Sequence, residues 1–314
     1  MIPHAPTDAA LPTTLGAPAP VRTVDLTALR SAAESIARDA GALVLRHYEH
    51  GVGIDFKGDV GNVVTDADRA SEALIVAALA ERFPTHGVVA EEGGGSVGGV
   101  DGAGADSAAV GAVTWLVDPL DGTNNFASGF PVFAVTLAAV ADGEILAGAT
   151  YDPLRDEMYS AHRGGGATLN GRPMAVSRQA QLAAALVGTG FAYDKATAVD
   201  NNLAEVITIV PLVRGLRRAG ACALDLAWVA AGRLDAFWER GPVAWDLAAG
   251  VLLVQEAGGR VTGHHGEPLD LDGGRVLATN GVLHAMLLER LAAARTLIGQ
   301  LPMAAPARPD DDPS

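Results

Sequence analysis

The sequence predicts a mixed α and β protein in which helices and sheets pack as layers. Three observations support this class. Segments with apolar residues at helical spacing alternate with short apolar runs typical of buried strands. Hydrophobic residues make up 49% of the 314 residues, which is enough for a sizeable core. The length suits one large domain or two packed subdomains.

The first half of the chain begins with two expected helices. Apolar residues recur at helical spacing from Leu26 to His50, and residues 67–83 show a helical pattern with Thr65 or Asp66 as the cap. The runs "GVVA" (87–90) and "VTWLV" (113–117) then predict short buried strands. From "FAVTLAAV" (133–140) to "LAGATYDP" (146–153), the pattern becomes one of strands and turns.

The second half contains two further expected helices around a strand. "ACALDLAWVAAG" (221–232) predicts a helix that ends at Gly232, and "RLDAFWE" (233–239) predicts a strand. "DLAAGVLLVQEAGG" (246–259) predicts a helix that begins at Asp246 and ends at Gly258.

Three segments lack the composition of a packed structure. Residues 1–23 are rich in Pro, Ala and Thr, and residues 299–314 form a similar tail, so we expect disorder in both. Residues 93–112 form a Gly/Ala insert that we expect to be flexible. The folded domain is therefore expected at 24–298.

Charge and cysteine content exclude some classes of protein. The formal net charge of −15 argues against a nucleic-acid binder, which would need a basic face, although solubility alone explains such a charge equally well. The single cysteine, Cys222, allows no intramolecular disulfide. No signal peptide and no membrane-spanning run is evident, so we expect a cytoplasmic protein without a membrane partner.

Acidic residues recur where strands end or helices begin. Glu91 and Glu92 follow the strand 87–90, Asp118 and Asp121 follow 113–117, and Asp246 stands at a helix start. Carboxylates gathered at such positions repel each other unless a divalent cation holds them, and a set of oxygen ligands without His or Cys favours Mg²⁺.

Each acid also has a structural interpretation when it is taken alone. Asp246 would serve as an N-cap, and Asp118 before Pro119 would be a turn residue. Glu91 and Glu92 would be solvated loop acids, and Asp68 would complement the N-terminus of its helix. Only the joint pattern favours a site.

Four segments together resemble the inositol monophosphatase family. They are "GDVGNVVTDAD" (58–68), "VAEE" (89–92), "DPLDGTNNF" (118–126) and "WDLAAGVLLVQEAGG" (245–259). The resemblance extends from about Leu26 to Leu291. It implies a layered α-β-α-β-α sugar-phosphatase fold with a metal-binding half (24–165) and a substrate-facing half (166–298), and a homodimer.

The resemblance also implies two to three Mg²⁺ ions in each site. Glu91, Asp118 and the backbone carbonyl of Leu120 resemble the ligands of one ion. Asp118, Asp121 and Asp246 resemble the ligands of a second, which Li⁺ is expected to replace. These positions are implied by the family pattern and are not deduced from the spacing.

The catalytic residues implied by the resemblance are Asp68, Thr123 and Glu91. Asp68, together with Glu91, matches the acid that holds a weaker third metal through water. Thr123 and Asp68 resemble the pair that orients and deprotonates the attacking water. The backbone amides of Gly122 and Thr123 would receive the phosphate, and Glu239 matches an acid that accepts a hydrogen bond from a substrate hydroxyl.

Some substrate positions depart from the family pattern. Asn124 replaces a threonine that is common in the family. Ala221 and Cys222 lie where the family contacts the sugar ring, and Cys222 is expected to be a packed residue rather than a reactive thiol. Lys57 lies in a segment that matches a mobile loop over the site.

The function predicted from these residues is Mg²⁺-dependent hydrolysis of a phosphate monoester, with inositol 1-phosphate as the leading substrate. Fructose 1,6-bisphosphate, histidinol phosphate and adenosine 3′,5′-bisphosphate are the alternatives within the superfamily. A non-catalytic protein that interacts with the transcription machinery is the alternative from another class. A nucleotide-phosphate transferase is not favoured, because no Gly-rich loop ending in Lys-Ser/Thr is present.

Overall fold

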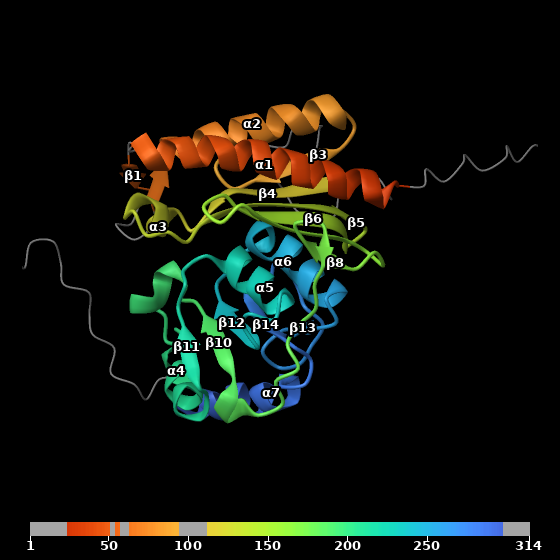
Figure 1. Ribbon diagram of the computed structural model, residues 1–314. Helices are drawn as coiled ribbons and strands as arrows, with labels where there is room; N and C mark the ends of the chain where they lie inside the picture. Colours follow the sequence, from red (N-terminus) through yellow and green to blue (C-terminus); the bar gives the residue numbers. More distant parts are fainter. Residues whose placement is uncertain (1–23, 51–53, 57–62, 94–111, 298–314) are drawn as a thin grey trace, which may run out of the picture.

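The computed structural model describes residues 24–50, 54–56, 63–93 and 112–297. In this part of the chain, helices and sheets form layers in the order α-β-α-β-α (Figure 1), as the sequence predicts. The predictions for 1–23, 299–314, Lys57 and residues 94–111 of the insert lie outside the described residues.

The first layers consist of two helices on a seven-stranded sheet. α1 (Leu26–His50) and α2 (Asp66–Arg82) cover one face of this sheet (Figure 1). Its strands follow the spatial order β3-β4-β5-β6-β7-β8-β9, and among these described strands only β3 and β4 pair in parallel. The strand bounds are β3 Gly87–Ala90, β4 Thr114–Asp121, β5 Ala134–Ala141, β6 Glu144–Asp152, β7 Glu157–His162, β8 Ala167–Leu169 and β9 Arg172–Pro173.

A five-stranded sheet forms the second β layer, with the order β11-β10-β12-β14-β13. Its strands are β10 Leu186–Thr189, β11 Gly215–Arg217, β12 Ala236–Arg240, β13 Arg260–Thr262 and β14 Arg275–Thr279. α5 (Cys222–Ala230) and α6 (Ala244–Glu256) lie between the two sheets, and α4 (Leu203–Ile209) and α7 (His284–Ala294) cover the far face (Figure 1).

Smaller elements complete the fold. β1 (Ile54–Phe56) and β2 (Val63–Thr65) form an antiparallel pair, and α3 (Thr123–Ala127) follows β4. Short 3-10 helices span Leu182–Ala184, Tyr193–Ala196, Val210–Leu212 and Arg295–Leu297. β8 and β9 belong to the first sheet although they lie beyond residue 165. The division into a metal-binding half and a substrate-facing half at 165/166 stays a prediction.

Most predicted helix boundaries agree with the structure. α1 has the predicted bounds, Thr65 caps α2, and Gly258 lies just beyond the end of α6 with a positive φ of 87°. The prediction that Asp246 opens α6 is wrong, because the helix begins at Ala244. Asp246 instead lies in the first turn, where its Oδ2 accepts a hydrogen bond from Val243 N at 3.0 Å.

The position of α6 explains its composition. Every residue from Leu247 to Val254 is buried, because the helix has a sheet on each side of the layer that it shares with α5. A helix that is apolar all round belongs in such an interior. α1 instead buries one stripe, which includes Ala33, Ile36, Ala37 and Ala40, against the first sheet.

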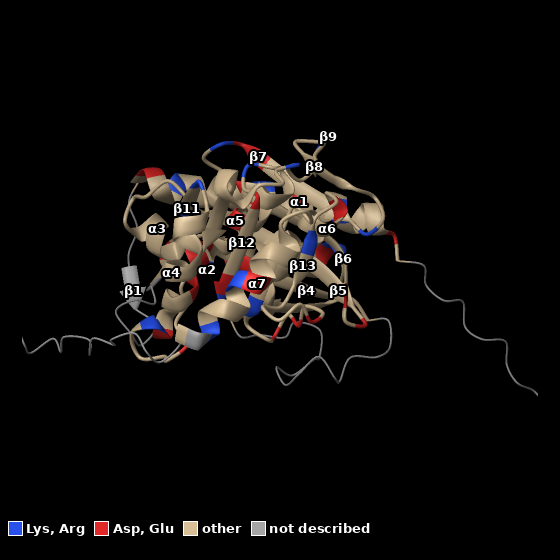
Figure 2. Cartoon of the chain, turned by 90° about the horizontal axis from the view of Figure 1, so that it is seen from below, with Lys and Arg blue, Asp and Glu red and all other residues tan. Residues whose placement is uncertain are grey.

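The face of the molecule that carries α7 and β13 bears charges of both signs. Figure 2 shows acidic and basic residues interspersed over the described part of this face. No described helix combines the length and apolar character needed to cross a bilayer.

Candidate active site

A cavity of about 220 Å³ lies where β4, α5, β12 and the start of α6 meet. It gathers residues from segments more than 150 positions apart in the sequence. The predicted site residues that line it are Glu91, Asp118, Leu120, Asp121, Gly122, Thr123, Asn124, Ala221, Cys222, Glu239 and Asp246. Of the other predicted residues, Asp68 lies in contact with Thr123, and Lys57 falls outside the described residues.

The end of β4 shapes one wall of this cavity. Pairing with β5 is regular up to Asp118, and the register shifts between Asp118 and Asp121. Pro119 lies in this irregular part, and it has no N–H to donate to the ladder. The Leu120 N–H donates instead to Asp118 Oδ1 at 2.9 Å. The chain therefore leaves the sheet with two carboxylates and the Leu120 carbonyl close together.

One buried polar face of α2 organises the surrounding segments. Asp68, Ser71 and Glu72 stand at i, i+3 and i+4, which places them on one side of the helix. Asp68 Oδ1 accepts from the Thr123 hydroxyl at 3.0 Å, and Ser71 Oγ donates to the Pro119 carbonyl at 2.8 Å. Glu72 Oε2 accepts from Glu92 N at 2.7 Å. Each contact holds a different segment of the candidate site.

Asp121 connects the first sheet to α5. Its two carboxylate oxygens accept from Cys222 N at 3.1 Å and from Ala223 N at 2.9 Å. The residue at the helix's own N-cap position, Ala221, has no side chain that could do this. Asp121 therefore stabilises unpaired N–H groups of the first turn from another element of the chain.

Gly122 joins β4 to α3 in a conformation that requires glycine. Its φ is +91°, in the left-handed region. A Cβ at this position would lie 2.9 Å from the Val132 carbonyl oxygen, so a side chain would not fit even with that backbone. The tight turn brings Thr123 to the edge of the cavity.

Burial raises the pKa of the clustered carboxyl groups. The pKa of Asp118 lies well above its ordinary value because of burial first and repulsion from Glu91, Asp121 and Asp246 next. Burial also raises the pKa of Asp121 to about 7, against the lowering effect of its hydrogen bonds to α5. The pKa of Asp246 is raised for the same reason, again with burial as the largest cause. A cation in the cavity would favour the charged forms.

The carboxyl groups share a cavity without yet converging on one point. Among the described residues, no three Asp, Glu, His or Cys side chains lie close enough together to hold an ion as they stand. Asp118 is 2% exposed and Asp121 is 7% exposed, so neither charge is well solvated. Oxygen-only donors of this kind suit a hard divalent cation.

The opposite wall contains a second set of ionisable groups. Burial and repulsion from Asp121 raise the pKa of Glu239 to about 7. Burial raises the pKa of the Cys222 thiol well above its ordinary value. Cys222 is therefore a protonated, packed residue in this structure.

Sequence reasoning missed several residues at the site, among them Arg218, Asp225 and Asn125. Arg218 and Asp225 line the cavity, and Asn125 Nδ2 donates to the carbonyls of Val132 at 2.8 Å and Ala219 at 2.9 Å. Asn125 thereby joins the segment after α3 to the segment before α5. An acid within the apolar run "ACALDLAWVA" was the available signal for Asp225, whereas no local pattern points to Arg218.

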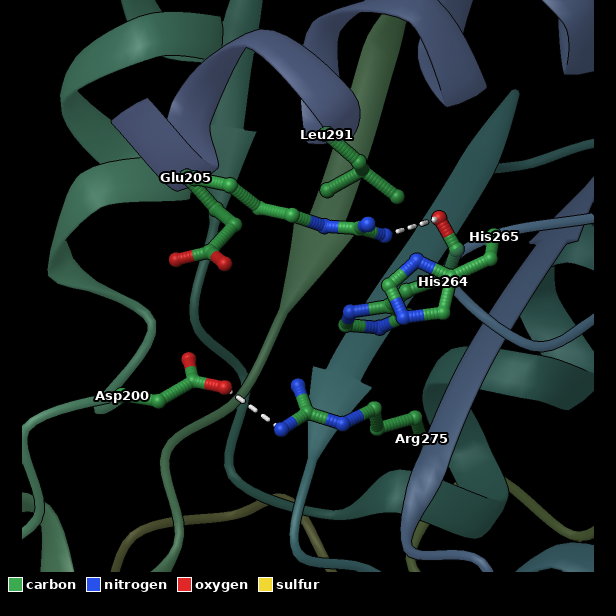
Figure 3. Close-up of a pocket in the computed structure, with 7 residues that line it drawn as sticks. Asp200, Glu205, His264, His265, Arg275 and Leu291 are labelled. Atoms are coloured by element: carbon green, nitrogen blue, oxygen red, sulfur yellow. Dashed lines mark hydrogen bonds and ion pairs between the residues drawn. The ribbon is translucent and has the colours of Figure 1, made fainter. Parts of the chain in front are cut away.

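A smaller cavity of about 140 Å³ lies between α4, α7 and the second sheet (Figure 3). Arg275 forms an ion pair with Asp200, and Arg295 donates to the His264 carbonyl. Glu205 lines the same cavity and is 4% exposed. None of the predicted site residues that the structure describes reaches this cavity. Its charged contacts join Asp200, before α4, to β14, and Arg295, directly after α7, to the segment after β13.

The layered fold and the carboxylate-lined cavity define the class of layered α+β phosphatases. The chain belongs to the inositol monophosphatase family, whose family model matches residues 25–298. An inositol-1-monophosphatase from Synechocystis is 45% identical over 76% of this chain and 80% of its own length. A Nus factor SuhB from Pseudomonas aeruginosa is 46% identical over 78% of this chain and 88% of its own length.

Solved structures agree with this assignment. The inositol monophosphatase from Anabaena superposes with a TM-score of 0.75 at 38% identity, covering 89% of this chain and 98% of that chain. The extragenic suppressor protein SuhB from Bartonella henselae gives a TM-score of 0.76 at 36% identity, covering 84% and 98%.

Proposed function

We propose that the protein is an Mg²⁺-dependent inositol-1-monophosphatase, which converts inositol 1-phosphate and water into inositol and phosphate. The observation that carries the proposal is the cavity that joins the carboxylates of β4 and α6 to Glu239 of β12. The relative from Synechocystis, which bears the name inositol-1-monophosphatase, supports the same substrate.

The donor set fits divalent cations. Buried carboxylates that raise one another's pKa values are costly to ionise without a counter-charge. We propose that one ion is held by Glu91, Asp118 and the Leu120 carbonyl, and that a second is held by Asp118, Asp121 and Asp246. When bound, the ions would neutralise phosphoryl charge and stabilise the developing charge on the leaving alkoxide.

Asp68 and Thr123 are proposed to handle the attacking water. The Thr123 hydroxyl lies 3.0 Å from Asp68 Oδ1, within hydrogen-bond reach for a proton relay. Burial raises the pKa of Asp68 in spite of its hydrogen bonds to Thr65 and Thr123, which makes it a stronger base than a solvated aspartate. Asp68 is also proposed to hold a weaker third ion with Glu91 through water.

The remaining residues are proposed to bind the substrate. The amides of Gly122 and Thr123 would receive the phosphate, with Asn124 supporting this turn. Glu239 would accept a hydrogen bond from a hydroxyl of the leaving group. Ala221 and Cys222 would contact the ring. We further propose that the protein is cytoplasmic, that it forms a homodimer and that it does not bind nucleic acid.

Phosphate release from inositol 1-phosphate, with and without Mg²⁺, tests the proposal directly. The same assay with fructose 1,6-bisphosphate, histidinol phosphate and adenosine 3′,5′-bisphosphate ranks the superfamily alternatives. We expect the highest kcat/KM for inositol 1-phosphate, and a higher value for any other member of the panel would contradict the substrate assignment. Inhibition by Li⁺ is expected from the family resemblance.

A second candidate function follows from the relatives named as Nus factors. One of them is 46% identical over 248 residues. In this alternative, the chain interacts with the transcription machinery independently of catalysis. Replacing the chromosomal gene with Asp118→Asn separates the two: a cell phenotype that appears with a fold-disrupting variant such as Leu253→Asp, but not with Asp118→Asn, favours the interaction role.

A further inference from the structure

Asp225 is a buried acid in the candidate active site that the reaction proposed above does not use. It lies in the first turns of α5, is 1% exposed and lines the same cavity as Glu239. Its Oδ1 atom is buried and has no hydrogen-bond partner within the described structure. An unpaired carboxylate oxygen in such a place is destabilising. A substrate group that donates to it would remove that cost.

Two glycines at the end of β10 leave room for Asp225 and Glu239. Gly188 lies in β10, and Gly190 follows directly after its last residue, Thr189. A Cβ at Gly188 would lie 3.1 Å from Asp225 Oδ1, and a Cβ at Gly190 would overlap the Glu239 carboxylate. The two acids therefore occupy neighbouring positions against one strand, although they come from α5 and β12.

The surroundings of this pair favour hydroxyl groups as ligands. Glu239 and Asp225 each face repulsion from Asp121, and Glu239 repels Asp225. Burial is the largest cause that raises the pKa of both acids, and the charge of Arg218, which lines the same cavity, opposes this rise. Two adjacent acceptors match two adjacent hydroxyl donors. A second phosphate group would meet two carboxylates at this wall.

We propose that Asp225 accepts a hydrogen bond from a second hydroxyl of the leaving group, beside the hydroxyl that Glu239 accepts. The pair selects a neutral polyol with neighbouring hydroxyls and disfavours a bisphosphate. This inference rests on the proposed function, because it assigns a specificity-determining residue to the same site. It concerns the leaving group alone, so the phosphate and the attacking water are unaffected.

The test compares Asp225→Ala with the wild type on two esters. Inositol 1-phosphate offers ring hydroxyls, whereas p-nitrophenyl phosphate offers none. We expect kcat/KM for inositol 1-phosphate to fall at least about tenfold, mainly through KM, because the substitution removes the acceptor of a buried hydrogen bond. The value for p-nitrophenyl phosphate should stay within about twofold. A proportional fall on both esters would overturn the proposal.

Single-deoxy analogues of inositol 1-phosphate identify the hydroxyl. For the analogue that lacks the group contacting Asp225, wild type and Asp225→Ala should give equal kcat/KM values. The conservative variant Asp225→Asn should recover part of the lost activity, because its amide oxygen still accepts. If every analogue distinguishes the two proteins as strongly as inositol 1-phosphate does, Asp225 contacts no substrate hydroxyl.

Glu205 provides a matched control for the loss of a buried acid. It is 4% exposed and its Oε2 also lacks a partner in the described structure, but it lines the separate cavity of Figure 3. Glu205→Ala should leave the ratio of kcat/KM values for the two esters unchanged. A change in that ratio as large as the one caused by Asp225→Ala would assign the effect to general destabilisation. Thermal melts of both variants accompany the kinetics.

The wild-type protein separates failure of this inference from failure of the proposed function. Turnover of p-nitrophenyl phosphate without turnover of inositol 1-phosphate would overturn the proposed substrate. The variants would then be compared on whichever phosphate in the superfamily panel the wild type prefers. The proposed role of Asp225 is contradicted if Asp225→Ala does not lower kcat/KM for that preferred phosphate more than it lowers kcat/KM for p-nitrophenyl phosphate.

Discussion

The Thr123 hydroxyl lies 3.0 Å from Asp68 Oδ1 and 3.0 Å from the Leu120 carbonyl oxygen. A hydroxyl carries one proton, so Thr123 can donate to only one of these acceptors at a time. Asp68 Oδ2 is meanwhile held by the backbone N–H of Thr65 at 2.8 Å. Asp68 is therefore fixed in position, and Thr123 can change its donor direction without moving.

This arrangement predicts different outcomes for two substitutions of Thr123. Thr123→Ala removes the hydroxyl, and we expect kcat to fall by about 10²-fold or more because a general acid–base contact is lost. Thr123→Ser keeps the hydroxyl, so kcat should stay within about tenfold of the wild type. Steady-state kinetics on inositol 1-phosphate measure both. Equal losses in the two variants would show that the hydroxyl has no role in the chemistry.

Glu239→Gln should alter substrate preference more than catalysis. The amide can still hydrogen-bond a hydroxyl, but it loses the charge that strengthens this contact. We expect a clear loss of kcat/KM for inositol 1-phosphate and a slight loss for p-nitrophenyl phosphate. Assays of both esters under the same conditions provide the comparison. If both esters lose activity equally, Glu239 is not a contact to the polyol.

The metal-free protein should lose stability as the pH rises from 6.5 to 8. The folded-state pKa values of Asp121 and Glu239 are about 7, above their ordinary values, so the folded protein retains protons that the unfolded chain has already released. This stabilisation is present at low pH and disappears as the pH rises through about 7. Below pH 6.5 two histidines oppose this effect. Burial lowers the pKa of His264 and His284 to about 4, so the unfolded chain binds protons that the folded protein does not, and the folded protein loses stability as the pH falls.

Thermal melts in EDTA at pH 6.5 and pH 8 measure this dependence. The Tm should be lower at pH 8, Asp121→Asn should reduce the difference, and added Mg²⁺ should raise the Tm more at pH 8 than at pH 6.5. A higher Tm at pH 8 in EDTA would show that these acids are not buried as described.

Activity should require a divalent cation of the right size. We expect negligible turnover in excess EDTA and full recovery with Mg²⁺, because the clustered carboxylates then regain their counter-charge. Ca²⁺ should inhibit in competition with Mg²⁺, since its longer and looser coordination misplaces the reacting groups. Phosphate release measures all three conditions. Undiminished turnover in EDTA is incompatible with the proposed site.

The sequence was sufficient for the elements that local pattern controls. Helical spacing gave α1 its bounds, and Thr65 was a predictable cap because a capping residue lies beside its helix. The start of α6 was missed because Val243 and Ala244 carry no recognisable start signal, whereas Asp246 does. Asp246 caps the helix from within its first turn, because its carboxylate accepts a hydrogen bond from Val243 N.

Local pattern could not supply contacts made across the fold. The approach of Asp121 to the first turn of α5 joins residues about 100 positions apart, and only the packing of the two layers creates it. Asp225 was missed for the same reason, because its neighbours Gly188 and Glu239 come from two other elements, β10 and β12. The motifs of the family located the acids of β4 and α6, but not the residues that position them.

Kinetics of Asp118→Asn on inositol 1-phosphate with saturating Mg²⁺ test the central claim most directly. Asp118 is proposed to contact both cations, so the neutral amide should lower kcat by at least about 10³-fold, as the loss of a key electrostatic group does. Circular dichroism should show an intact fold, since the change opens no cavity in the core. A folded Asp118→Asn protein with a kcat within about tenfold of the wild type would contradict the two-metal account.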